Sequence, residues 1–178
     1  GPNDLVLDAH GGIYFSDARR AAKGGGDEAP GQDRDAVYYL SASGVLTRLD
    51  MILGRPEGIA LSPDGTYLYV ADAARACVMA YEVTGPGAVR NGRLYAEVKG
   101  QPGGLCVDAA GRLYVAAAPG IWVFSVAAAD KAPCIGVINV PENPTNCAFG
   151  GEGLTTLYVT TPRTLYKVRL LAEGLRLT

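Results

Sequence analysis

Histidine is almost absent from this sequence: one residue of 178 is a histidine, alongside one tryptophan and two methionines. Acidic and basic side chains nearly balance, and the net charge of −2 gives no electrostatic reason to bind nucleic acid. No apolar run approaches the roughly 18–20 residues that a membrane-spanning helix needs. These shortages disfavour a Cys/His zinc centre, a nucleic-acid partner and a membrane partner.

Glycine and proline are plentiful by contrast, with 24 and 11 residues, and 48% of the chain is hydrophobic. Apolar runs alternate with these turn-forming residues, which indicates a folded chain rather than a disordered one. The length is sufficient for one domain with a buried core. The sequence has no initiator Met and opens inside a repeat, so we expect an incomplete chain.

One short pattern occurs four times and organises the chain. Each copy contains a proline, a variable residue, a small or polar residue, an apolar run, a Gly/Asp turn and an aromatic strand; the clearest copy runs from Gly54 to Asp72. The repeat prolines are Pro2, Pro56, Pro102 and Pro144, so successive copies lie 54, 46 and 42 residues apart. Periods of about 40–50 residues with four strands each are typical of propeller blades.

The fold class that this pattern predicts is an all-β propeller with about four four-stranded blades. Its strands are rich in Val, Ile, Leu, Tyr, Phe and Thr, and no sustained helical period competes with them. The polar, glycine-rich segment 19–35 is expected to be a surface loop, either shaping a pocket mouth or present as a tolerated insertion. The predicted blades cover residues of about 1–50, 54–99, 100–142 and 143–178 of a single domain.

The four cysteines are Cys77, Cys106, Cys134 and Cys147, and none forms a C-x-x-C pair. Cys106 and Cys147 lie in apolar strand runs at comparable positions of the repeat. Buried, reduced thiols are the favoured interpretation, because free cysteine is among the most buried residue types. The sequence leaves a disulfide between any pair open.

The proline-led segments resemble the gluconolactonase, regucalcin and luciferin-regenerating-enzyme family over nearly the whole chain. The segments that carry the resemblance are Pro2-Asn3-Asp4-Leu5, the stretch 54–65, Pro102-Gly103-Gly104-Leu105 and the stretch 144–151. Family members are six-bladed propellers, so the resemblance implies that this chain is part of a six-bladed ring and lacks N-terminal blades. It also implies a lactonase that holds one divalent metal on the central axis, most often calcium, with magnesium, manganese or zinc as alternatives.

The resemblance assigns the site residue by residue, with departures. Asn3 matches an Asn that contacts substrate beside the metal, and Glu57 stands where the family usually has a metal-binding Asn. Gly103 stands where the family has an Asp that is both metal ligand and proton carrier, while Thr145 and Asn146 match a segment near the channel. The resemblance therefore gives Glu57 as candidate catalytic residue, Glu57 and Asn3 as candidate metal ligands, and Asn3, Thr145 and Asn146 as candidate substrate contacts.

Two interpretations of these departures stay open. In the first, the carboxylate has moved to Glu57 and the chain is a metal-dependent hydrolase of a sugar lactone or similar small ester. In the second, the site has degenerated, Glu57 pairs with a cation such as Arg55, and the propeller binds a small ligand or protein partner without catalysis. Open blade edges would favour self-association in either case. His10 and the strand-end residues Asp17 and Asp72 are weaker candidates, for which turn and structural roles are expected.

Overall fold

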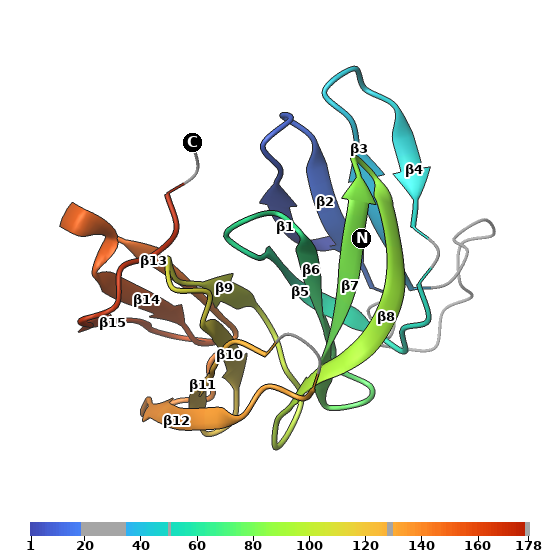
Figure 1. Ribbon diagram of the computed structural model, residues 1–178. Coiled ribbons are helices and arrows are strands. Elements are labelled where there is room, and N and C mark those ends of the chain that lie inside the picture. The colour runs from blue at the N-terminus through green and yellow to red at the C-terminus, as the bar shows by residue number, and fades with distance from the viewer. Residues whose placement is uncertain (19–34, 50, 128–129, 177–178) are drawn as a thin grey trace.

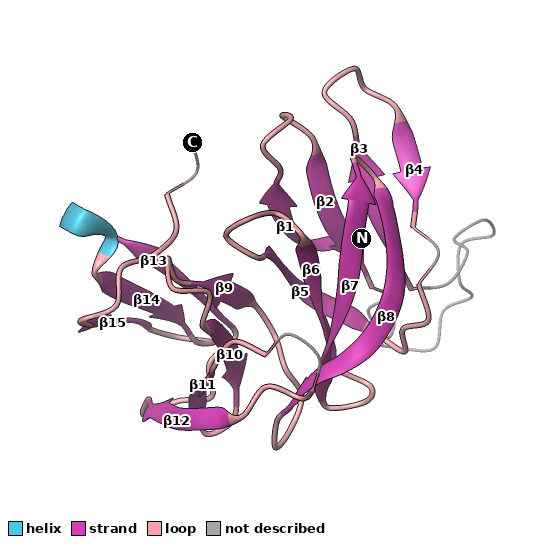
Figure 2. Ribbon diagram, in the orientation of Figure 1, coloured by secondary structure: helices cyan, strands magenta, loops and turns pink. Residues whose placement is uncertain are grey.

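The computed structural model describes residues 1–18, 35–49, 51–127 and 130–176, so most of the predicted loop 19–35 lies outside the described residues. Fifteen strands and one short 3-10 turn, η1 (Glu152–Leu154), make up the regular structure of the described part (Figures 1 and 2). The all-β prediction is confirmed. No helix among these residues has the length and apolar character needed to cross a membrane.

The strands form four consecutive antiparallel sheets, here called blades one to four. Blade one contains β1 (Pro2–Leu7), β2 (Ile13–Asp17), β3 (Ala36–Leu40) and β4 (Leu46–Arg48). Blade two contains β5 (Pro56–Leu61), β6 (Tyr67–Asp72), β7 (Cys77–Gly85) and β8 (Ala88–Glu97). Blade three contains β9 (Leu105–Val107), β10 (Leu113–Ala117), β11 (Gly120–Phe124) and β12 (Cys134–Asn139). Blade four contains β13 (Asn146–Gly150), β14 (Thr156–Thr160) and β15 (Leu165–Arg169).

Blade four has three strands among the described residues, where four were predicted. The segment after β15 does not add to this sheet. It crosses back to blade three, where Gly174 forms an antiparallel bridge with Asp108 and the Ala109 N–H donates to the Glu173 carbonyl at 2.8 Å. The end of the described chain therefore ties blade four to blade three.

The Gly/Asp turns of the repeat join the first two strands of blades one to three. In blade one, Asp8 Oδ1 accepts hydrogen bonds from the N–H groups of His10 and Gly12, at 2.9 and 2.7 Å. Asp108 does the same for Ala110 and Arg112 in blade three, at 3.0 and 2.9 Å. A short carboxylate at this point holds the turn, because its oxygens replace backbone acceptors.

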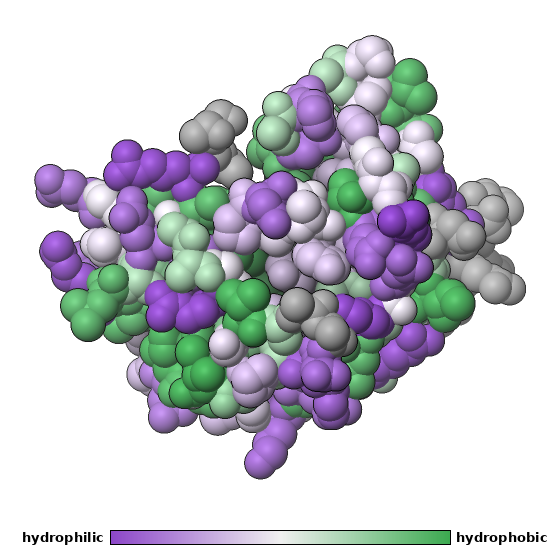
Figure 3. Space-filling model, viewed as in Figure 1, coloured by the Kyte–Doolittle hydropathy of each residue, from purple (hydrophilic) through white to green (hydrophobic). Residues whose placement is uncertain are grey.

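Three hydrophobic clusters lie between successive sheets and join the blades. Tyr14, Val37 and Tyr39 of blade one pack with Leu68 and Val70 of blade two. A second cluster joins blades two and three, and a third joins blades three and four. The first strands β1, β5, β9 and β13 come together at the centre of the molecule (Figure 1). Apolar atoms also gather on the surface at the β3–β4 turn (Figure 3), where Val45 is 61% exposed.

Candidate functional site

The first strands of neighbouring blades approach each other at backbone distance. The Gly58 N–H donates to the Gly103 carbonyl at 3.1 Å, and the Gly104 N–H donates to the Thr145 carbonyl at 2.9 Å. These bonds bring residues 103 and 145 into a chain of contacts across blades two to four, and a side-chain contact between residues 3 and 57 joins blade one to blade two.

Glu57 is held between two neighbours. The Asn3 side-chain amide donates to Glu57 Oε2, which links blades one and two. Arg55 Nε lies 3.2 Å from Glu57 Oε1, and Arg55 Nη2 donates to Gln101 Oε1 at 3.0 Å. The Glu57 side chain is 22% exposed. Its charge is thus balanced by Arg55, as the second interpretation of the sequence expects.

Gly103 is glycine because blades three and four leave no room for a side chain. A Cβ built at this position would lie far inside van der Waals contact of the Thr145 carbonyl oxygen, which is a backbone atom and cannot rotate away. A Cβ at Gly58 would meet the Gly103 carbonyl in the same way. A carboxylate at position 103 would therefore require the first strands of blades three and four to move apart.

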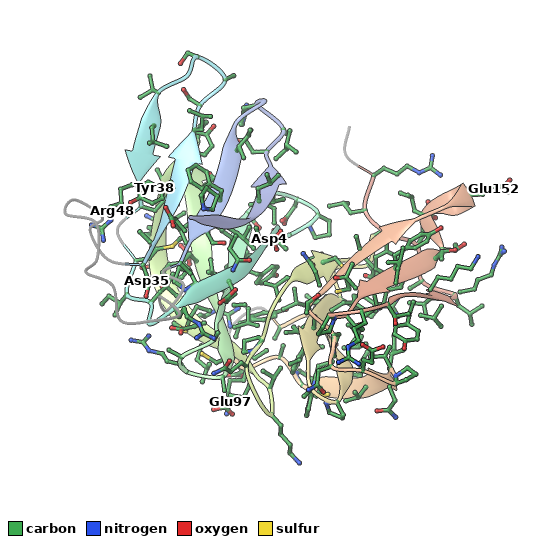
Figure 4. The ribbon with its side chains drawn as sticks, turned by 180° about the vertical axis from the view of Figure 1, so that it is seen from behind. Asp4, Asp35, Tyr38, Arg48, Glu97 and Glu152 are labelled. Atoms are coloured by element: carbon green, nitrogen blue, oxygen red, sulfur yellow. The ribbon has the colours of Figure 1, made fainter. Side chains whose placement is uncertain are left out.

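Asp4 is a site residue that the sequence analysis did not single out. Its Oδ2 accepts from the Ile59 N–H at 3.2 Å, and its Oδ1 accepts from the Leu5 N–H at 3.0 Å. Burial raises the pKa of Asp4, and hydrogen bonds from Ile59, Leu5 and the Asn146 side chain offset part of that rise. Figure 4 shows Asp4 at the centre of the molecule, between blade one and the strands of blades three and four.

The repeat contains the signal that identifies Asp4. The second residue after each repeat proline is Asp4, Gly58, Gly104 or Asn146. A Cβ at Gly104 would collide with the Asn146 side-chain amide, so the glycine of blade three makes space for the polar side chain of blade four. At this position of the repeat, the two outer blades have a polar residue and the two inner blades have glycine. The polar side chains of the outer blades extend over the inner blades.

Asp4 and Asn146 line a cleft of about 510 Å³, which we call the channel cleft. Its walls are mainly apolar and come from the first strands of all four blades, including Leu5, Ile59, Leu105 and Cys147. Thr160 adds a hydroxyl group at the blade-four side. Few polar groups face this space, so those present determine how a ligand is oriented.

Two candidate substrate contacts of blade four differ in availability. Thr145 Oγ1 donates to the Thr160 carbonyl at 3.1 Å and lies 2.9 Å from Thr160 Oγ1, so it is occupied within its own sheet. Asn146 Oδ1 accepts from the Cys147 N–H at 2.7 Å, which fixes the amide and turns its NH₂ group away from that backbone contact. Asn146 is therefore the better placed of the two.

The four cysteines are free. Cys77 and Cys147 are buried, Cys106 is partly exposed and Cys134 is exposed, so burial holds for some of the thiols and is wrong for Cys134. Cys106 Sγ and Cys147 Sγ lie 3.5 Å apart, across the interface of blades three and four.

The weaker candidates lie away from the channel cleft. His10 is exposed in the β1–β2 turn. Asp17 forms an ion pair with the N-terminal amino group at 2.9 Å. Asp72 is fully buried and accepts hydrogen bonds from the N–H groups of Gly54 and Arg55, so it holds the chain that leads into β5.

Comparisons with known proteins identify a matching family and a curated relative. The SMP-30/Gluconolactonase/LRE-like region matches residues 1–163. A gluconolactonase of Zymomonas mobilis subsp. mobilis is 31% identical over 187 residues, which cover 97% of this chain and 51% of the relative. This chain thus spans about half the length of that curated relative.

Solved structures give the same assignment. A gluconolactonase of Xanthomonas campestris superposes with a TM-score of 0.81 at 30% identity, covering 95% of this chain and 57% of the other. The calcium-binding protein regucalcin of Agrobacterium tumefaciens has a TM-score of 0.79 at 21% identity, covering 97% and 62%, which shows a shared fold alone. The chain belongs to the SMP-30/gluconolactonase/LRE-like family.

Proposed function

We propose that this chain forms part of a lactone hydrolase and that its substrate, a sugar lactone or similar small ester, enters the channel cleft. The observation that carries the proposal is the convergence of four first strands on one cleft where a carboxyl group, Asp4, meets an amide, Asn146. The family and the related gluconolactonases support the same class of reaction.

Hydrolysis needs a group that takes a proton from water and returns it to the departing ring oxygen. Water attacks the lactone carbonyl carbon, the carboxylate accepts its proton, the C–O ring bond breaks, and the proton passes to the alkoxide to give a hydroxy acid. Asp4 lines the channel cleft, and its raised pKa moves it toward the pH at which one group serves as both base and acid. Asn146 would orient the substrate carbonyl or hydroxyl groups.

Glu57 remains a candidate for the same role, with Asn3 as a substrate contact beside it. Its two oxygens face Arg55 and Asn3, and those of Asp4 accept hydrogen bonds from backbone N–H groups, so a substrate would meet an occupied carboxylate at either residue. Glu57 is also absent from the lining of the channel cleft, which favours Asp4 as proton carrier.

The metal that the family resemblance implies does not fit the described residues. Calcium sites need several carboxylate and carbonyl oxygens around one point. Here Glu57 is paired with Arg55, Gly103 has no side chain, and the described residues contain no group of three or more His, Cys, Asp or Glu arranged to hold a metal.

The test is turnover of glucono-δ-lactone by this chain, followed as acid release, with the variants Asp4→Asn and Glu57→Gln. Asp4→Asn should lower kcat by about 10²-fold or more, because general acid–base catalysis contributes roughly that much. Asp64→Asn, in the β5–β6 turn, is the matched control and should leave kcat unchanged. Equal turnover by Asp4→Asn and the unaltered chain would remove Asp4 from the reaction. Calcium and a chelator are added in parallel, and a chelator-sensitive rate would show that the reaction needs a metal that these described residues do not hold by themselves.

The alternative is a ligand-binding propeller without catalysis, and the Arg55–Glu57 ion pair together with the closed position 103 favours it. A lactone that raises the melting temperature of the chain while no acid is released would support this alternative. Loss of that shift in Asn146→Ala would place the ligand in the channel cleft.

A further inference from the structure

Cys106 and Cys147 lie close enough for their sulfur atoms to be in contact. Their sulfur atoms lie 3.5 Å apart, although 41 positions separate them in the sequence. Cys106 belongs to β9 of blade three and Cys147 to β13 of blade four, and both line the channel cleft. The two thiols thus face each other across a blade interface, within reach of a solute that enters the cleft.

We propose that Cys106 and Cys147 are a thiol–disulfide modification site, which a small oxidant of the peroxide class converts to a disulfide that locks blade three to blade four. The sulfur atoms need to move about 1.5 Å closer to reach the usual S–S bond length. Both residues lie on first strands that are already joined by the Gly104–Thr145 hydrogen bond of 2.9 Å, so the backbone places the pair side by side.

The two cysteines have different parts in the reaction. The Cys106 sulfur attacks the peroxide as the thiolate, the O–O bond breaks, and one water leaves as Cys106 becomes a sulfenic acid. Cys147 Sγ then attacks the Cys106 sulfur, the S–S bond forms, and a second water leaves. Two thiols and one hydrogen peroxide give one disulfide and two waters.

The environment of Cys106 sets the speed of this reaction. The hydrogen bond with Cys147 and burial raise its pKa well above the ordinary value, and the negative charges of Asp108 and Asp4 act in the same direction. The thiolate is the attacking form, so the pair stays reduced at low peroxide and reacts at sustained exposure. The immediate proximity of Cys147 then favours the disulfide over further oxidation of the sulfenic acid.

The experiment uses the full chain in a Cys77→Ala, Cys134→Ser background, so that the pair holds the only thiols. The Cys134 change matters because no Lys or Arg separates residues 134 and 147, and trypsin would leave both on one peptide. After hydrogen peroxide treatment and alkylation with N-ethylmaleimide, we expect a cross-linked peptide pair containing residues 106 and 147 and loss of both alkylation sites. Dithiothreitol should restore both sites.

The control variants are Cys106→Ser and Cys147→Ser in the same background. Each should keep one alkylatable or overoxidised thiol and form no internal cross-link. The unaltered chain provides a second readout that needs no substitution: oxidation should raise its melting temperature by roughly 5–10 °C, reversibly with dithiothreitol. Two intact alkylation sites after peroxide, or sulfinic acid at Cys106 without any cross-link, would overturn the proposal.

Discussion

The inner and outer blades of this molecule bury their strands differently. In blade two, β6 has five fully buried residues of six, because blades one and three cover both of its faces. In blade four, β15 alternates between exposed and half-buried residues, because blade three alone covers it among the residues that the structure describes. Similar strand sequences are therefore buried on both faces in blade two and on one face in blade four.

The two outward faces of the outer blades differ as well. On blade one this face contains Leu5, Ile13, Phe15 and Leu40, which line a shallow pocket. On blade four Lys167 and Arg169 are exposed beside Leu165 on β15, and they pair with Tyr158 and Thr156 of β14, respectively. The outward face of blade one is thus mainly apolar, whereas that of blade four mixes charged and apolar side chains, and four predictions test how far these differences reach.

The largest effect is expected from truncating a side chain in an inner blade. Leu113 on β10 is 0% exposed and packs in the cluster between blades two and three. Leu113→Ala should lower the free energy of unfolding by about 2–5 kcal/mol, the usual cost of a buried leucine and the cavity it leaves. Urea denaturation measures the change.

The matched control is Leu165→Ala in blade four, where the side chain is 62% exposed. Its cost should stay within about 0.5 kcal/mol, as for most surface substitutions. Similar losses for both variants would show that inner and outer blades are not distinguished by burial.

The next effect concerns the close approach of the first strands. Gly103→Asp places a Cβ against the Thr145 carbonyl oxygen, so we expect a loss of about 1–3 kcal/mol from forced backbone shifts. Gly136→Ala on the open strand β12 is the control, because a Cβ there meets nothing within 4 Å. Denaturant titration measures the stability of both variants. If Gly103→Asp is as stable as Gly136→Ala, the first strands of blades three and four separate easily and a carboxylate can enter the channel.

A smaller effect is expected on self-association, which the sequence predicts through open edges. The apolar outward face of blade one should drive it, so the double variant Leu5→Lys, Phe15→Lys should raise the concentration at which dimers form by about tenfold, or 1.4 kcal/mol. Analytical ultracentrifugation measures the midpoint. Leu165→Lys on blade four should leave this midpoint unchanged. A shifted midpoint in Leu165→Lys and an unchanged one in the double variant would assign the dimer contact to blade four.

Much of this architecture could be predicted from the sequence. Pro2 and Pro56 begin the first strands β1 and β5, and Pro102 and Pro144 lie just before β9 and β13, because local turn chemistry recurs with each blade. The path of the chain after β15 could not be predicted in this way: Gly174 pairs with Asp108 through a long-range contact that no local pattern specifies.

The candidate site was less accessible to sequence reasoning. The contact of Asn3 with Glu57 follows from adjacent blades, and the Arg55 pairing was one of two interpretations left open. Asp4 was missed because its environment depends on Ile59 and Asn146 of other blades. A residue whose role is set by two distant segments has no signature in its own segment.

The smallest effect is a pH dependence that separates Asp4 from the turn carboxylates. Burial raises the pKa of Asp4 above its ordinary value of 3.8, so the folded chain keeps a proton that the unfolded chain releases. Stability should therefore fall as the pH rises from about 3.8 through the raised pKa of Asp4. Asp4→Asn removes this contribution, and the stability of the variant relative to the unaltered chain should increase over that interval.

Asp64 gives the opposite sign and serves as the control. Hydrogen bonds from Ser62 and Thr66 lower the pKa of Asp64, so the unfolded chain binds its proton more tightly. The stability that Asp64 contributes is present above pH 3.8 and is lost as the pH falls through its lowered pKa. Asp64→Asn lacks this contribution, so the variant should become less stable relative to the unaltered chain as the pH rises over the same range. Urea unfolding from pH 3 to pH 7 compares the two variants. Parallel curves would contradict the burial of Asp4 in the channel cleft, because a solvated carboxyl group at this position has no reason to titrate differently in the folded chain.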